Sequence, residues 1–132
     1  ACENTIIFTQ MTSEIIYIGA LRTSATHCHS GSAIETDAPL DNHGLAQRFS
    51  PTDLVATALG SCMLTIMGIA ANTHQINIDG TRLQVEKIMA NEPRRIAEII
   101  IHFYFQEINS GRTLSFFRNR QIPCWKESCG AQ

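Results

Sequence analysis

The sequence predicts an α+β fold, and three observations lead to this prediction. A strongly marked helix start opens a long apolar helix near the middle of the chain, the first third is rich in β-branched residues, and the segment after the helix alternates apolar and polar residues. Strands grouped on either side of one long helix are typical of α+β domains. With 132 residues, the chain is expected to form one domain, residues 1–132, in the order βββ-α-ββ-α.

Three segments before the helix are predicted to be strands because of their β-branched residues: Ile6–Gln10, Glu14–Arg22 and Ser24–Thr36. A loop is expected from Asp37 to Arg48, where Asp, Asn, Pro and Gly are concentrated. This loop leads directly into the helix.

The start of the helix is well defined by its first residues. Ser50 is a preferred N-cap, Pro51 suits the first helical position, and Asp53 completes a capping box. From Leu54 to Ala71 the helix carries no charge and only small polar residues, so no face suits open water. We therefore expect this helix to be covered on all sides.

The length of the helix favours an oligomer. About 24 residues span about 36 Å, which exceeds the diameter of a small domain. Small residues at Ala56, Gly60 and Gly68 lie on one stripe, where a second helix, such as that of a symmetry mate, is expected to approach. A membrane span is the alternative, but the charge-free part is near the lower limit of about 17 to 25 residues.

A hairpin and a short helix are predicted after the long helix. Residues Ile76–Ala90 alternate apolar and polar side chains, Asn91–Pro93 form a turn, and Arg95–Phe105 form the second strand. Ser110 is a candidate cap for a last helix, which would end before Pro123.

Composition excludes some functions. The net charge is −2 and no segment has the clustered Lys and Arg that binding to phosphate groups requires, so nucleic acid is not an expected partner. No positively charged start followed by an apolar run marks a secretory signal. A cytoplasmic location is expected.

The five cysteines are odd in number and irregular in spacing, which fits neither a disulfide framework nor a zinc pattern. They are expected to be reduced thiols. His27, Cys28 and His29 cluster, but neighbours on a strand point to opposite faces, so an ordinary strand is favoured over a metal site.

The segment ETDAPLDNHGLAQRFSPTDLVATALGSCMLTIMGIAA resembles the OsmC/Ohr family of thiol-dependent peroxidases, in the subgroup whose long helix begins with SPTDL and carries its reactive cysteine in GSC. The resemblance covers about nine-tenths of the chain and implies an intertwined homodimer, with strands wrapped around long buried central helices. It also implies that an active site at the dimer interface reduces organic hydroperoxides, or hydrogen peroxide in some members, without a metal or other cofactor.

In this resemblance Cys62 is the reactive cysteine. The attacking species is a thiolate, and a free cysteine has a pKa near 8.5, so a nearby cation is needed. Cys62 lies too far inside the helix for the helix dipole to lower the pKa of its thiol, so an arginine is the expected cation.

In the family, an arginine oriented by an acidic residue at the helix start fills this role. Arg48 is the preferred candidate because it adjoins the helix start, and Arg22 is the alternative. Many members have a carboxylate at the position that Thr52 takes here. Asp53, one position later, either orients the arginine or serves only in the capping box.

The resemblance also implies a second thiol after the last helix. Cys124 is the candidate that would condense with oxidised Cys62, and an external dithiol or a lipoylated protein would reduce the disulfide. The tail, IPCWKESCGAQ, departs from the family pattern, so Cys129 is an alternative resolving residue, and loss of the resolving step is another.

A second function class stays open beside the peroxidase. A dimer that keeps the fold but has lost the catalytic cycle would bind a small molecule or a hydrophobic ligand in its interface pocket. Thr52 and the unusual tail favour this alternative.

Overall fold

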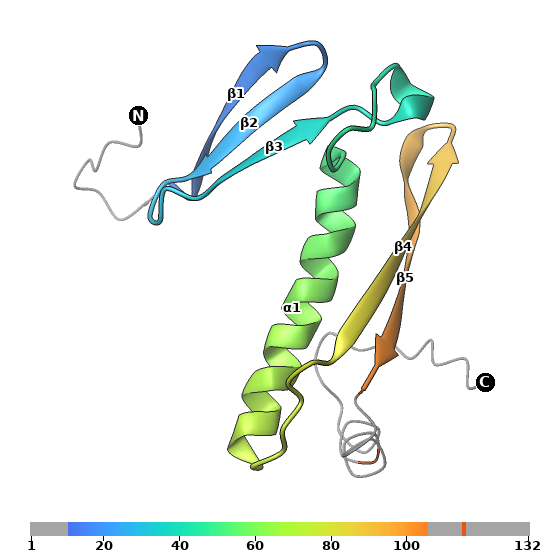
Figure 1. The fold of residues 1–132 in the computed structure, drawn as a ribbon. Coiled ribbons are helices and arrows are strands. Elements are labelled where there is room, and N and C mark those ends of the chain that lie inside the picture. Colours follow the sequence, from blue (N-terminus) through green and yellow to red (C-terminus); the bar gives the residue numbers. More distant parts are fainter. Residues whose placement is uncertain (1–10, 106–114, 116–132) are drawn as a thin grey trace. The chain divides into compact units, whose positions relative to one another are not determined.

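The structure is a computed structural model that describes residues 11–105 and Ser115 (Figure 1). Strands precede and follow one long helix, which confirms the α+β fold. The chain divides into two compact units, residues 1–54 and 55–132, and each is described by itself. The predicted strand at residues 6–10 and the predicted last helix lie outside the described residues, apart from Ser115.

The first unit contains an antiparallel sheet in the order β1-β2-β3. Its strands are β1 (Ser13–Gly19), β2 (Arg22–His27) and β3 (Ala33–Asp37). The predicted strand boundaries were wrong at two turns. Residues Ala20 and Leu21 turn the chain with φ values of 51° and 59°, and the segment predicted as one strand from Ser24 to Thr36 is interrupted by a turn before β3.

The physical reason differs between the two turns. A two-residue hairpin loop with both φ values positive normally carries Asn or Gly, and here alanine and leucine occupy it, so the residue types gave no turn signal. The second turn contains Gly31 with a φ of 72°, which is a turn signal of the ordinary kind.

Between β3 and the helix, the chain forms a tight loop with a short 3-10 helix, η1 (Leu40–Asn42). The amides of Asn42 and Gly44 both donate to the Pro39 carbonyl, at 2.9 and 3.0 Å, and the amide of Ala46 donates to the Ala38 carbonyl at 3.2 Å. A Cβ at Gly44 would lie 1.7 Å from the Ala38 carbonyl oxygen, so no other residue fits there. The loop is thus closed by backbone contacts.

Helix α1 (Pro51–Thr73) has 23 residues and begins where the capping signals predicted. The amide of Asp53 donates to Ser50 Oγ at 3.1 Å, and the amide of Ser50 donates to the Asp53 carboxylate at 2.8 Å, which confirms the capping box. At the other end, Gln75 adopts a positive φ of 55° and the amide of Ile76 donates to the Ala71 carbonyl at 2.9 Å. This is a Schellman motif without glycine.

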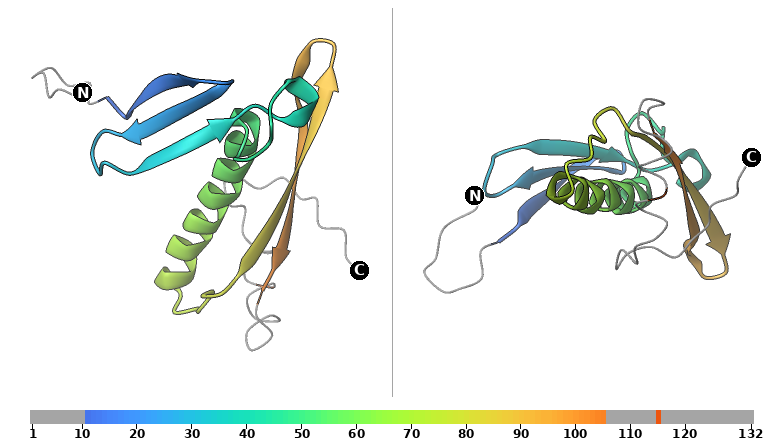
Figure 2. Two further views of the ribbon diagram at one scale, coloured as in Figure 1. Left: turned by 45° about the horizontal axis from the view of Figure 1, so that its top comes forward. Right: turned by 90° about the horizontal axis from the view of Figure 1, so that it is seen from below.

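In the second unit, β4 (Arg82–Asn91) and β5 (Arg94–Tyr104) form an antiparallel ribbon (Figure 2). The predicted hairpin is confirmed, but its first strand begins six residues later than expected, because residues 76–81 form turns. An Asx turn at Asn77 and a hydrogen bond from Thr81 to the Ile78 carbonyl replace the ladder there. Met67 and Ala71 of α1 form the core with Ile76, Ile78, Ala70, Phe103 and Phe105.

Candidate functional site

Cys62 lies near the middle of α1 and is a free, exposed cysteine in the single chain. It sits about three turns from the helix start, beyond the unpaired amides of the first turn. Gly60, two residues earlier, faces the opposite way and packs on β4, because a Cβ there would lie 3.1 Å from Val85 Cγ2 and 3.4 Å from Leu83 Cδ1. The buried side of α1 therefore holds the helix on its own ribbon and presents the cysteine outward.

This contact corrects the prediction for the stripe of small residues. Ala56 and Gly60 are buried, and Gly60 packs against side chains of β4, not against a second helix. The glycine allows close approach as predicted, but the neighbour that uses it is a strand of the same chain.

The outward side of α1 carries an apolar seam around Cys62. Its members are Val55, Leu59, Cys62, Ile66 and Ile69. Their spacing alternates between four and three residues, which keeps them on one face and is the pattern of a helix that packs along another helix. Val55 and Ile69 are 56% and 64% exposed in the single chain, so the predicted cover on all sides is not supplied by the described residues.

By length and composition, α1 is the one helix of the described chain that could cross a membrane. Four of its residues are nevertheless buried in the single chain, namely Ala56, Gly60, Met67 and Ala71. The core helix of a soluble domain combines the same length and composition with such contacts.

Asp53 is found in its structural role at the helix start. Its carboxylate accepts the Ser50 amide hydrogen bond, and the Ser50 hydroxyl lies 3.1 Å from that of Thr52. Thr52 thus joins the capping group at the position where a carboxylate was expected from the family resemblance.

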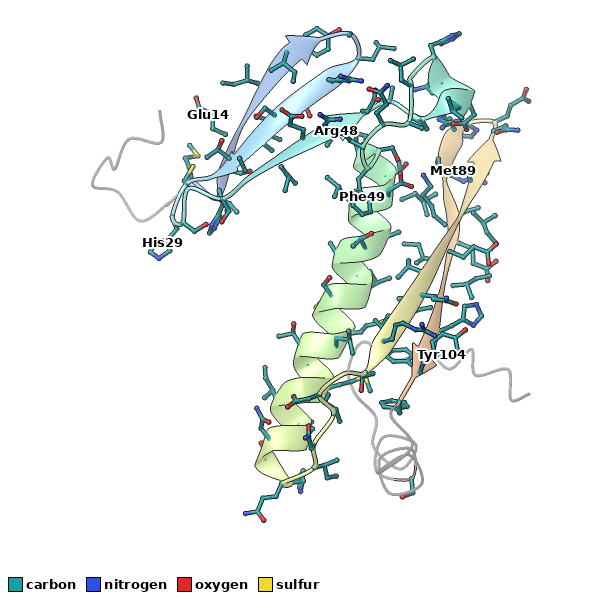
Figure 3. All side chains as sticks on the ribbon, viewed as in Figure 1. Glu14, His29, Arg48, Phe49, Met89 and Tyr104 are labelled. Carbon is teal, nitrogen blue, oxygen red and sulfur yellow. The ribbon has the colours of Figure 1, made fainter. Side chains whose placement is uncertain are left out.

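Arg48, the preferred candidate for the cation, is paired with a carboxylate of the first sheet. Its Nε donates to Glu35 at 2.6 Å, and Figure 3 shows the side chain of Arg48 beside β3. Both partners are well exposed, with side-chain exposures of 41% and 46%. An exposed pair of this kind contributes about 0–1 kcal/mol to stability.

Arg22, the alternative candidate, belongs to a more buried group. Its Nη2 lies 3.4 Å from the carboxylate of Asp37 and also contacts Gln47 Oε1 closely. The backbone amide of Gln47 donates to the same Asp37 oxygen at 3.0 Å. The side chain of Asp37 is fully buried and that of Arg22 is 23% exposed.

Asp37 is held in its charged form. The amide hydrogen bond from Gln47 lowers the pKa of Asp37, burial raises it, and the neighbouring charge of Arg22 lowers it, with a net shift below the ordinary value of 3.8. The carboxylate therefore stays ionised in the interior of the first unit.

Asp37, Gln47 and Glu35 were not predicted as part of the site. The available signal was the spacing of two acidic residues on β3. Glu35 and Asp37 are two positions apart, so their side chains lie on the same face of the sheet. Arg22 lies on that face too, because it is opposite Asp37 on the neighbouring strand. That pairing was hidden because the turn before β3 was missed. Cys124 and Cys129 lie outside the described residues.

The His27 to His29 segment is not continuous strand. His27 ends β2, and its Nδ1 lies 2.7 Å from Ser30 Oγ, whereas His29 stands on the turn and points away from the sheet (Figure 3). Cys28 is disulfide-bonded, which corrects the expectation that all five cysteines are reduced. Within residues 11–105 and Ser115, no three His, Cys, Asp or Glu side chains gather as a metal site.

Comparison with known proteins identifies the family. The sequence profile of the OsmC-like proteins matches residues 43–113. A protein of Psychrobacter arcticus 273-4, provisionally assigned to the osmotic stress induced and detoxification response, has 47% identity over 87% of this chain and 84% of its own, with a TM-score of 0.78. A search of curated proteins found no match. On the family match and this identity, the chain belongs to the OsmC-like family.

Proposed function

We propose that this protein is a cysteine-dependent peroxidase that reduces organic hydroperoxides as part of a stress or detoxification response. The observation that carries the proposal is the presentation of Cys62, which is free, exposed and central on the apolar seam of α1 in a chain of the OsmC-like family. A structural cysteine in an apolar helix is ordinarily buried. The similarity to the Psychrobacter protein supports the detoxification role.

The proposed enzyme is a homodimer in which two copies of the seam pack together. In the single chain, Leu59 and Ile69 are 39% and 64% exposed, and covering them removes apolar area from water. The first sheet needs cover as well. Among the described residues of the first unit, 11–54, the buried ones are Thr36, Asp37 and Ser50, and all three are polar, so these residues form no apolar core among themselves.

The reaction begins with attack of the Cys62 thiolate on the terminal oxygen of the hydroperoxide. The O–O bond breaks, an S–O bond forms, and the leaving alkoxide takes a proton and departs as the alcohol. Cys62 is oxidised to a sulfenic acid. An arginine, Arg48 or Arg22, would stabilise the thiolate and orient the peroxide, because a guanidinium is always charged and offers a fork of donors.

A second thiol then condenses with the sulfenic acid, forms a disulfide and releases water. Cys124 remains the candidate, with Cys129 as the alternative. An external dithiol or a lipoylated protein reduces the disulfide and returns both thiols. At the edge of the packed seams, the apolar residues nearest Cys62 would offer hydrocarbon contact to a substrate, which suits an alkyl or aryl hydroperoxide better than hydrogen peroxide.

The function is tested by consumption of dithiothreitol with cumene hydroperoxide. We expect the wild type to turn over and Cys62→Ser to lose at least about a hundredfold of the rate, because no nucleophile of comparable strength replaces the thiolate. Ser61→Ala, an exposed neighbour on the same helix, is the matched control and should keep the wild-type rate. Trapping with dimedone should label Cys62 only after peroxide is added.

Equal peroxide consumption by wild type and Cys62→Ser would remove the peroxidase proposal. The second candidate function would then stand, namely a dimer that binds a hydrophobic small molecule at the seam. Thr52, which takes part in capping in place of the expected carboxylate, favours that candidate. In either case we propose a cytoplasmic protein without membrane or nucleic-acid partners.

A further inference from the structure

The side chains that surround Cys62 on the surface of α1 are of two kinds. Residues three and four positions apart are neighbours on a helix, so Cys62 lies among Ala58, Leu59, Thr65 and Ile66. Because a helix has about 3.6 residues per turn, Ala58 and Thr65 fall on one side of Cys62, and Leu59 and Ile66 fall on the other. Cys62 therefore lies between bulky members of the apolar seam and a pair of small residues, one of which carries a hydroxyl group.

The side with the small residues is open in the single chain. Ala58, Cys62 and Thr65 are all exposed, and none but Cys62 belongs to the seam. Ser61 is exposed too, but consecutive residues point about 100° apart around a helix, so its hydroxyl group does not face Cys62. The Cβ atoms of residues three positions apart lie about 5–6 Å from each other. Thr65 is thus the polar side chain of α1 that lies beside the sulfur.

The hydroxyl group of Thr65 already uses its hydrogen. Oγ1 of Thr65 donates to the Ser61 carbonyl at 2.9 Å. A threonine hydroxyl has one hydrogen and two lone pairs, so an oxygen whose hydrogen is engaged can still accept a hydrogen bond but cannot donate a second one. A molecule that binds to Thr65 beside Cys62 must therefore supply the hydrogen itself.

A hydroperoxide carries such a hydrogen on the oxygen atom that the thiolate attacks. The attack forms the S–O bond and breaks the O–O bond, whose electron pair leaves with the alkoxide, and the alkoxide takes a proton from water. The hydrogen of the attacked oxygen stays in place and becomes the hydrogen of the sulfenic acid. An acceptor at Thr65 would therefore keep the same hydrogen-bond partner from substrate to product.

We propose that Thr65 is a substrate-binding residue of the peroxidase, whose hydroxyl oxygen accepts the hydrogen bond of the hydroperoxide O–H group beside Cys62. The contact holds the O–O bond in a fixed direction relative to the sulfur, which favours attack. It also selects hydroperoxides over dialkyl peroxides, which have no O–H group to donate. This inference rests on the proposed peroxidase function.

The test compares two reagents that react with the same thiolate. Cumene hydroperoxide has an O–H group, whereas methyl methanethiosulfonate has no hydrogen-bond donor. Rapid quenching and mass spectrometry of the peptide that contains Cys62 give the rate constant for loss of its free thiol with each reagent. We expect Thr65→Val, which keeps the shape but loses the hydroxyl group, to react about fivefold more slowly with the hydroperoxide and at the wild-type rate with the thiosulfonate.

Two further variants separate substrate binding from a general effect on the helix. Thr65→Ser restores the hydroxyl group and should recover most of the rate with cumene hydroperoxide. Thr73→Val is the matched control, because Thr73 Oγ1 donates to the Ile69 carbonyl at 3.0 Å in the same way but lies at the far end of α1. It should react with both reagents at the wild-type rate. Circular dichroism checks that each variant is folded.

The inference is overturned if Thr65→Val reacts with the hydroperoxide within about twofold of wild type, or if it slows both reagents equally. An equally slow Thr73→Val, or a Thr65→Ser as slow as Thr65→Val, would overturn it too. Should Thr65→Val fail to fold, Thr65→Ala takes its place with the same expected rates and the same criteria.

Loss of the proposed function is recognised separately. If wild type consumes peroxide no faster than Cys62→Ser, the peroxidase proposal falls and the role of Thr65 falls with it. An active wild type with an unaffected Thr65→Val removes the role of Thr65 alone.

Discussion

Asp37 combines complete burial with a negative charge, and its stability contribution depends on pH. The sign follows from the downward shift, since the folded protein binds its proton less readily than the unfolded chain, whose value is near 3.8. The contribution is complete above the unfolded value and is lost as the pH falls through the lower folded value. Below about pH 3.8, unfolding should therefore become easier through this residue.

We expect the urea midpoint of the wild type to fall more steeply than that of Asp37→Asn as the pH is lowered below about 3.8, and the two curves to run parallel above about pH 5. The measurement is urea unfolding followed by circular dichroism at fixed protein concentration. A difference between the two proteins that is the same at pH 3 and pH 6 would contradict the assignment of a charged, stabilised Asp37.

At single residues, contacts between near neighbours in the sequence could be predicted, whereas contacts between distant residues could not. The capping box of Ser50 and Asp53 follows from a spacing of three residues, and the structure confirms it. The contact of Arg22 with Asp37 joins residues fifteen positions apart, and it depends on the register of two strands. Register is set by turns and by burial of one face, which this chain signals weakly.

At the scale of elements, the packing of α1 on β4 requires a glycine at one of two positions. Gly60 allows the close approach of β4, whereas Gly68 has no such neighbour among the described residues. A Cβ at Gly60 would press on Val85 and Leu83, whereas a Cβ at Gly68 would meet no atom within 4 Å among the described residues. Alanine gains up to about 1 kcal/mol over glycine inside a helix. Overpacking typically costs about 1–3 kcal/mol, which outweighs that gain at Gly60.

We therefore expect Gly68→Ala to raise the free energy of unfolding by about 0.5–1 kcal/mol. Gly60→Ala should lower it by up to about 2 kcal/mol. Thermal unfolding of both variants beside the wild type, at one protein concentration, measures the difference. A Gly60→Ala protein as stable as Gly68→Ala would show that the helix does not pack on β4 as described.

The elements themselves were predictable to different degrees. The capping residues at the start of α1 predicted the helix, and the alternation that includes Leu83, Val85 and Lys87 predicted the first strand of the hairpin. Both signals depend only on residues close together in the sequence. The turn at Ala20 and Leu21 was not predictable, since neither residue favours a positive φ. The sheet around it overrides that local preference.

For the molecule as a whole, large apolar side chains are exposed on both units among the residues that the structure describes. In the first sheet, Ile15 and Tyr17 project on one face and Ile16 on the other, all at least 59% exposed. The sequence predicted that α1 needs cover on every side, but it carried no sign that the sheet also does. The composition of a helix that is apolar on every face indicates that all its faces must be buried, whereas the composition of short strands does not indicate which of their faces are buried.

We expect Leu59→Glu to abolish dimerisation, because a charge buried without a partner costs about 3–5 kcal/mol, or at least a hundredfold in affinity. Light scattering after size exclusion should give about twice 14.6 kDa for the wild type and 14.6 kDa for the variant. Ile88→Glu places the same charge on an exposed apolar residue of β4 and should stay dimeric. A monomeric wild type would contradict the proposed assembly.

Within residues 11–54, the described part of the first unit, every buried residue is polar, and this has a consequence for how the protein depends on concentration. If that half of each polypeptide is completed only by another copy, folding and assembly become one bimolecular event. Catalytic output per molecule would then fall on dilution and recover on concentration. Cells would regulate such an activity simply through how much of the protein they synthesise.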